Sequence, residues 1–267
     1  MMADRWTRMV RQQVGLGRFL PLGGPYDGAW IAERAASGVL RGAAEREVPE
    51  VRLGGVRIGL ADPGEAAEPA VPAPPSALPP GPLRLTAEFA ATAAWPLPET
   101  ASRLRTALAV TATERIGLDL TEVDLRVTEL LDTEPPASRP GTPETRGGTD
   151  TSGGAGMPGA AESEAARAPG SAGVAGAVGG GAEGERVAAV VLRVPGVSRL
   201  TGVWGLPVRL GEQAPASGDA LPRRHARVDL AVAAGFRPLE VARAVRAAVA
   251  EALPDRPTVA VLVTDLD

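Results

Sequence analysis

The hydrophobic and polar positions along this chain repeat with two periods, and together they predict strands and helices. Residues 83–91 alternate apolar and polar side chains, which predicts a half-buried strand. Residues 97–111 carry apolar side chains on one stripe at helical spacing, and alternation returns at residues 123–130, so a helix and another strand follow. The same order of strand, helix and strand recurs at 228–232, 239–252 and 259–266.

The two halves of the chain also correspond position by position. When Glu99 is aligned with Glu240, the apolar stripes of the two predicted helices coincide. Residues 123–130 then match residues 259–266, and both are expected to be half-buried strands whose valines face the core. Recurrence in a fixed order indicates an internal repeat.

The parts upstream of these strands correspond as well. A helical stretch is predicted at 30–46 in the first half and at 185–193 in the second. Each is followed by a Val-Pro pair and then by a short strand, at 56–60 and 206–210 respectively. The order in each half is helix, strand, strand, strand, helix, strand. We therefore predict an α+β fold of two small two-layer domains, in each of which two helices cover one face of a sheet.

Two stretches lack this periodicity. Residues 133–184 contain 14 Gly, 11 Ala and 6 Pro, a composition that cannot offset the entropy of ordering, so we predict a long disordered linker. Residues 62–82 contain 8 Pro and predict an extended loop, either a stiff solvent loop or a PxxP docking segment.

The linker divides the chain into a first domain at 28–132 and a second at 185–267. Cutting the chain within 140–184 is expected to release two fragments that fold independently. Packing of the domains on each other, or dimerisation, is the alternative, because domains of this size bury a small share of their surface.

Composition excludes much chemistry. All 28 basic residues are Arg, Cys is absent and there is one His, so thiolate metal sites, thiol nucleophiles, a P-loop lysine and two-histidine metal sites are ruled out. We expect no enzymatic activity, no cofactor and no metal. The net charge of −4 argues against nucleic acid as a partner. The bias toward Ala, Arg, Gly and Pro is typical of a GC-rich bacterial genome of the actinobacterial type.

The few candidate chemical groups are expected to have no catalytic role. His225 follows two arginines and precedes Arg227, and these cations should depress its affinity for a proton. We expect an exposed residue at a strand edge; a buried carboxylate within hydrogen-bonding reach would instead indicate an enzyme. Acidic residues also gather at the predicted strand ends, where water is plentiful, namely Glu129, Asp132, Asp265 and Asp267.

The N-terminal segment, residues 1–27, is basic and amphipathic. Its apolar residues recur near helical spacing, and a helix of this kind can lie on an anionic membrane surface. Docking of the helix on the first domain is the alternative. The candidate membrane or partner contacts are Arg5, Trp6, Arg8, Met9, Arg11 and Phe19. No run of about 18 apolar residues and no signal peptide is evident, so we expect a cytoplasmic protein, with membrane association as the alternative.

The second half also resembles a known family. Val-Pro-Gly-Val at 194–197, the strand 228–232 that leads to Gly235, the helix rich in Val, Ala and Arg, and the terminal Val-x-Val-x-Val-x-Asp strand are similar to the alkaline shock protein family. The similarity covers residues 185–267 and, more weakly, 28–132. The first half departs from the pattern, since it has no clear counterpart of Gly235.

The resemblance implies a non-catalytic, often oligomeric protein of the cell-envelope stress response. Such a protein acts near the inner face of the membrane through protein partners, a membrane-anchored one among them, and through self-association. Direct peripheral membrane binding through residues 1–27 is the alternative function. An enzyme whose site is not visible in the sequence is a remote third.

Overall fold

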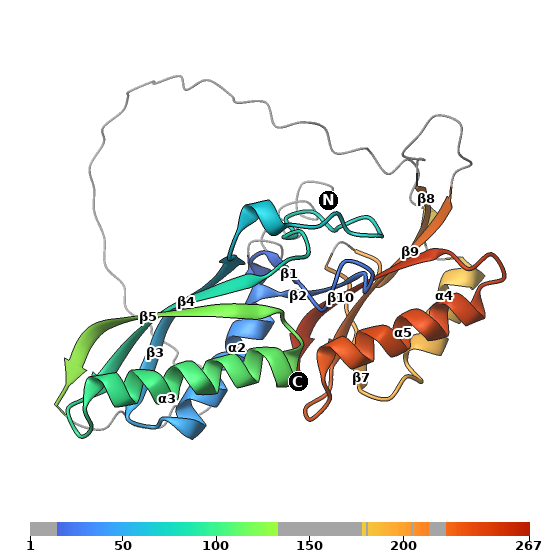
Figure 1. Cartoon of the computed structure of the whole chain (residues 1–267). Helices are drawn as coiled ribbons and strands as arrows, with labels where there is room; N and C mark the ends of the chain where they lie inside the picture. Colours follow the sequence, from blue (N-terminus) through green and yellow to red (C-terminus); the bar gives the residue numbers. More distant parts are fainter. Residues whose placement is uncertain (1–14, 133–177, 180, 204, 214–222) are drawn as a thin grey trace, which may run out of the picture.

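The computed structural model describes residues 15–132, 178–179, 181–203, 205–213 and 223–267 (Figure 1). The fold is α+β, as predicted from the sequence, and it contains two mixed sheets. Nearly all of the predicted linker lies outside the described residues, and its last residues already belong to a helix. No helix among the described residues is long and apolar enough to span a membrane.

The smaller sheet has the strand order β3-β4-β5, and two helices lie on one of its faces (Figure 1). β3 is antiparallel to β4, whereas β4 and β5 are parallel because a helix connects them. The strands are β3 (Val51–Leu60), β4 (Leu83–Thr92) and β5 (Leu120–Leu131). The helices are α2 (Glu33–Glu47) and α3 (Leu97–Val110), which continues into a π-helical turn, η2 (Thr111–Ile116).

The larger sheet has the order β1-β2-β10-β9-β8-β6, and β7 also pairs with β9. Its strands are β1 (Phe19–Pro21), β2 (Ala29–Ala32), β6 (Val178–Gly179), β7 (Val197–Leu200), β8 (Val208–Gln213), β9 (Arg223–Val232) and β10 (Thr258–Leu266). Helix α4 packs against β8 and α5 against β10. These helices are α4 (Ala182–Val191) and α5 (Pro238–Ala252).

The two sheets share one pairing pattern. β8 is antiparallel to β9 and β9 is parallel to β10, as β3, β4 and β5 are in the smaller sheet. The larger sheet then continues on the other side of β10, where β2 pairs with it in parallel and β1 pairs with β2. The N-terminal strands of the chain therefore complete the sheet of the second half.

This placement corrects the predicted start of the first helix. The helix was expected from residue 30, but α2 begins at Glu33, and Trp30 lies in β2. Trp30 and Ile31 point to opposite faces of the sheet, as neighbouring strand residues do, and both are buried because core side chains pack on both faces of the sheet at β2. A strand with two buried faces has no alternation, which is why the sequence did not reveal it.

The order predicted for the second half is observed, and the first half differs in one respect. The strand expected at 56–60 is the second part of a longer strand, β3, which begins at Val51 and has a bulge between Leu53 and Val56. Two glycines, Gly54 and Gly55, occupy the bulge, where they stand opposite the single residue Glu88 of β4.

The Pro-rich segment, residues 62–82, folds back onto β1. The backbone N–H of Leu78 donates to the carbonyl of Phe19 at 2.8 Å, and the N–H of Ala70 donates to the carbonyl of Pro25 at 2.9 Å. Val71 is buried. Of the two alternatives, a stiff solvent loop and a docking segment, neither describes the segment fully, because it is part of the intramolecular packing.

The two halves are in direct contact. Their buried apolar residues form one continuous cluster. Arg237, just before α5, donates through Nη2 to the carbonyl of Thr113 in η2 at 2.9 Å. Gly117 has a φ of +99°, and a Cβ there would lie 2.5 Å from the Cβ of Leu239, so this approach of the halves requires glycine.

Candidate functional site: a pocket between the two halves

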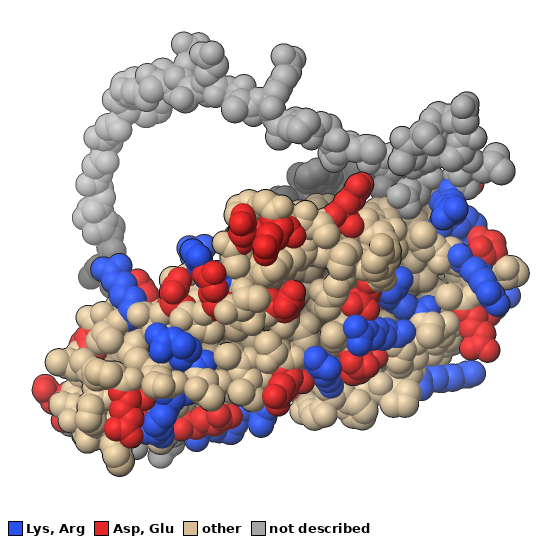
Figure 2. All heavy atoms as spheres, in the orientation of Figure 1, with Lys and Arg blue, Asp and Glu red and all other residues tan. Residues whose placement is uncertain are grey.

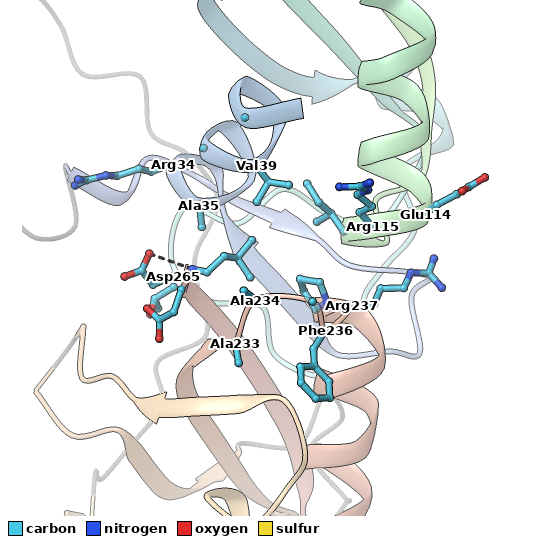
Figure 3. Close-up of a pocket in the computed structure, with 18 of the residues that line it drawn as sticks. Arg34, Ala35, Val39, Glu114, Arg115, Ala233, Ala234, Phe236, Arg237 and Asp265 are labelled. Atoms are coloured by element: carbon cyan, nitrogen blue, oxygen red, sulfur yellow. Dashed lines mark hydrogen bonds between the residues drawn. The ribbon is translucent and has the colours of Figure 1, made fainter. Parts of the chain in front are cut away.

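A cavity of about 930 Å³ lies where the two halves meet (Figure 3). We call it the junction pocket. It is bounded by α2 and η2 from the first half, and by the turn between β9 and α5 and the end of β10 from the second. Its volume is within the range of ligand-binding pockets, and an interface between two units is a common place for one.

Small residues on α2 make room for the pocket. Ala35, Gly38 and Gly42 recur at a spacing that places them on one side of the helix, and all three line the cavity. A Cβ added at Gly38 would meet no atom within 4 Å, so the space beside the helix is open. Val39 and Ile116 add apolar surface. The first-half wall is therefore recessed and apolar.

Three arginines and one acidic residue, Glu114, stand around this wall. Arg34 and Arg46 lie near the two ends of α2, and Arg115 lies in η2. Figure 3 shows Arg34 and Arg115 on opposite sides of the cavity. Among the described residues, no carboxylate oxygen lies within 4.0 Å of any of the three. Their guanidinium groups are thus available to an acidic ligand.

The acidic residues of the second-half wall are already paired. Arg199 of β7 donates through Nη2 to Asp265 at 2.6 Å and through Nη1 to Asp267 at 2.8 Å. Ser198 also hydrogen-bonds Asp267. The carboxylates that the sequence placed at the end of the last strand are therefore neutralised in the structure.

The strand-end acids of the two halves are not brought together. Glu129 lies in β5, where its Oε2 is 3.3 Å from Nη2 of Arg52, and Asp132 is exposed after the strand. Asp265 and Asp267 lie in the junction pocket instead. The acidic residues of the first half are therefore not paired with those of the second half.

His225 does not lie at an exposed edge, which corrects the prediction. It is half-buried in β9, between β8 and β10, and its Nδ1 is 2.9 Å from Oγ1 of Thr258. Burial, more than the nearby charge of Arg227, lowers the pKa of His225 to about 4. Among the described residues, the side-chain hydrogen-bond partner of the imidazole is thus a hydroxyl and not a carboxylate.

A second buried polar group lies farther along β9. Asp229 is fully buried, and its Oδ1 is 3.2 Å from Nε of Arg227. Burial raises the pKa of Asp229 to about 6, although Arg227 and Arg209 act in the opposite direction. Because Arg227 is the ion-pair partner of this carboxylate, we assign the group a structural role.

The described residues contain no group of three or more His, Asp or Glu that could hold a metal ion. Of the candidate contacts predicted in the N-terminal segment, Phe19 is fully buried in β1, where it pairs with Ala32. Intramolecular packing, one of the two alternatives, therefore holds for Phe19. The other five, Arg5, Trp6, Arg8, Met9 and Arg11, lie outside the described residues.

Sequence reasoning missed the junction pocket. Its walls come from segments that are far apart in the chain, such as 34–46, 114–116, 233–238 and 264–267, and no local spacing connects them. One signal was present, because Ala35, Gly38 and Gly42 form a stripe of small residues on an otherwise amphipathic helix.

Comparisons with models of known protein families, with curated proteins and with solved structures found no match. The resemblance of residues 185–267 to the alkaline shock protein family therefore stays a prediction.

Proposed function

We propose that this protein is a non-catalytic adaptor that binds an acidic segment of a protein partner in the junction pocket. The observation that carries the proposal is the pairing of a recessed apolar wall with Arg34, Arg46 and Arg115, none of which has an acidic partner among the described residues. Guanidinium groups bind carboxylates through charge-assisted, often bidentate hydrogen bonds, and apolar contacts with the wall add buried area.

The spacing of the arginines favours a peptide segment over a small molecule. Arg34 and Arg46 are separated by three turns of α2, which corresponds to about 18 Å at 1.5 Å per residue. An extended chain of about six residues covers that distance. A segment in which acidic and apolar residues alternate would place carboxylates at the arginines and its apolar side chains beside Val39 and Ile116.

An adaptor of this kind agrees with the function that the family resemblance implies. The partner class would be a protein with an acidic segment at the inner face of the membrane, and the protein itself would be cytoplasmic. Anionic lipid could also attract these arginines, so the test of this proposal includes a membrane surface.

The test is a selection of displayed random peptides of about twelve residues on the intact protein. We expect enrichment of sequences that combine Asp or Glu with apolar residues. A fluorescein-labelled selected peptide should then bind the triple variant Arg34→Glu, Arg46→Glu, Arg115→Glu at least about tenfold more weakly by fluorescence anisotropy, since each exposed ion pair contributes about 0.2–1 kcal/mol and reversal adds repulsion.

The matched control is Arg57→Glu, because Arg57 is an exposed arginine on β3 and does not line the pocket. Equal binding of the peptide by the triple variant and by the control would overturn the proposal, as would a selection without acidic enrichment. A separate experiment measures binding of the same variants to vesicles of phosphatidylglycerol. Loss of vesicle binding in the triple variant, without any effect on peptide binding, would assign the arginines to a membrane surface.

A further inference from the structure

The outer edge of β5 has no neighbouring strand among the described residues. β5 is a 12-residue strand that pairs with β4 along one side (Figure 1). The matching side of β10, its counterpart in the larger sheet, is occupied by β2. A long strand edge with unpaired backbone groups is a template for another strand.

The side chains of β5 alternate strictly through its centre. Val123, Leu125 and Val127 pair with core-facing residues of β4 and lie on the helix-covered face; Val127 is still 39% exposed. Asp124 and Arg126 lie on the opposite, solvent-facing side, where both are exposed. The pairing with β4 is continuous here, because its irregularities fall nearer the two ends of the strand.

We propose that β5 pairs antiparallel with β5 of a second copy of this chain, about a two-fold axis at Leu125. In this register Val123 lies opposite Val127 of the second copy, and Asp124 lies opposite Arg126 of the second copy. The two small sheets then join into one sheet of six strands. Two cross-strand ion pairs form on one face, and the exposed part of Val127 is covered on the other.

The charges of the strand specify this register. A two-fold axis at Asp124 would place Asp124 opposite its own copy, and an axis at Arg126 would place two arginines together, which is unfavourable in either case. An axis between residues would pair each apolar position with a polar one. The axis at Leu125 is the central register that keeps the apolar face continuous and places opposite charges together.

Both charges are available for this pairing. Arg126 has no carboxylate within 4.0 Å among the described residues, although Glu88 is its cross-strand neighbour on β4. Asp124 is 3.6 Å from Nε of Arg84, which pairs more closely with Glu122 at 2.5 Å. Figure 2 shows acidic and basic side chains interspersed over this side of the molecule, so no single sign of charge repels a second copy.

One side chain partly covers the edge. Nε of Arg105 in α3 donates to the carbonyl of Val123 at 3.2 Å. A carbonyl oxygen has two lone pairs, so it can accept this bond and one from a second strand. Arg105 therefore does not block the proposed pairing.

The test is the mass of the full-length chain in solution, measured by sedimentation over a range of concentrations. We expect a species with twice the 27.2 kDa mass of the chain. Asp124→Arg and Arg126→Asp each place like charges opposite each other twice in the dimer, and each should raise the dimer Kd about tenfold or more. The double variant Asp124→Arg, Arg126→Asp restores opposite charges and should restore the Kd of the wild type.

The control is Arg57→Asp, an exposed charge reversal on β3 of the same sheet. All four variants change exposed side chains, and their melting curves show whether each remains folded. A monomer at every concentration overturns the proposal, because the edge then has no second copy on it. A dimer that the single variants leave unchanged lies on another surface and also overturns it, as does a double variant that stays as weak as the single ones.

Discussion

β5 and β10 hold equivalent positions in the two halves, yet one is an edge strand and the other lies at the centre of a sheet. In β5, Asp124 and Arg126 are exposed. The aligned positions of β10 are Ala260 and Leu262, and both are buried. Side chains packed on both faces of β10 bury these residues, and β2 pairs with the side of β10 that in β5 has no neighbouring strand among the described residues. The number of neighbours that a strand has is thus set by a segment distant in the sequence.

The strands beside them show the same contrast. Arg84, Thr86 and Glu88 of β4 lie on the solvent side of the smaller sheet. Through the pairings with β5 and β10, they align with His225, Arg227 and Asp229 of β9. We call His225, Arg227 and Asp229 the polar row of β9. This row is largely buried, so the pKa values of His225 and Asp229 are shifted from their ordinary values.

The largest expected effect concerns the dependence of the second half on β2. The sequence led us to expect two fragments that fold independently. Because β2 pairs with β10, we expect a fragment of residues 181–267 alone to lack a cooperative thermal transition. Addition of the fragment 1–132, which carries β1 and β2, should restore the transition, and the two fragments should elute together.

The control is the full-length chain with a protease site placed within residues 140–177. After cleavage it should melt as the uncut chain does and elute as one species. A fragment 181–267 that melts cooperatively by itself, at the temperature of the full chain, would show that β2 adds little to the second half.

A smaller effect is expected from one substitution made at matched positions. Val263 in β10 is fully buried, and its counterpart Val127 in β5 is 39% exposed. We expect Val263→Ala to lower the free energy of unfolding by about 2–4 kcal/mol, because it leaves a cavity in a packed core. Val127→Ala should lower it by less than about 1 kcal/mol. Urea unfolding measures both.

Measurement at two protein concentrations separates any contribution of dimerisation to Val127→Ala, since only a dimer makes unfolding depend on concentration. Equal losses at the two positions would contradict the assignment of β5 as the more exposed strand.

Much of the fold could be predicted from the sequence. The strand at 83–92 and the helix that begins at Leu97 can be predicted from the spacing of their apolar residues alone, because each has one buried and one solvent-facing side. The apolar residues Ala260 and Leu262, in place of Asp124 and Arg126, were the signal that β10 is buried on both faces. The sequence predicts Trp30 to be a helical residue, because the four residues of β2 are buried on both faces and have no periodicity.

The site could not be predicted in the same way. The alternation in β9 places Asp229 on a polar face, and whether that face is solvated depends on the packing around the larger sheet. The junction pocket requires α2 to lie against the end of β10, a contact made by segments more than 200 residues apart. Local patterns specify which side of an element is apolar, but they do not specify which element covers it.

The net effect expected to be smallest in the wild type is a pH dependence confined to the buried polar row of β9, because two opposing contributions partly cancel there. The pKa of Asp229 is about 6 in the folded state, above the ordinary 3.8, so the folded state binds more protons between these values. Stability from this group therefore falls as pH rises from 3.8 to 6, by at most about 3 kcal/mol. The pKa of His225 is about 4, below the ordinary 6.5, so its contribution rises with pH from 4 to 6.5. In the wild type, the contributions of Asp229 and His225 to stability therefore change in opposite directions with pH.

Single substitutions should separate the two slopes. Relative to the wild type, Asp229→Asn should become more stable as pH rises from 4 to 6, because the cost of ionising a buried carboxylate is gone. His225→Gln should become more stable, again relative to the wild type, as pH falls from 6.5 to 4. Glu88→Gln is the matched control, because Glu88 is the exposed counterpart of Asp229 in β4. Urea unfolding at half-unit steps of pH measures all four proteins. If Asp229→Asn and Glu88→Gln give the same slope, the polar row of β9 is as well solvated as that of β4, and the contrast between the two sheets is wrong.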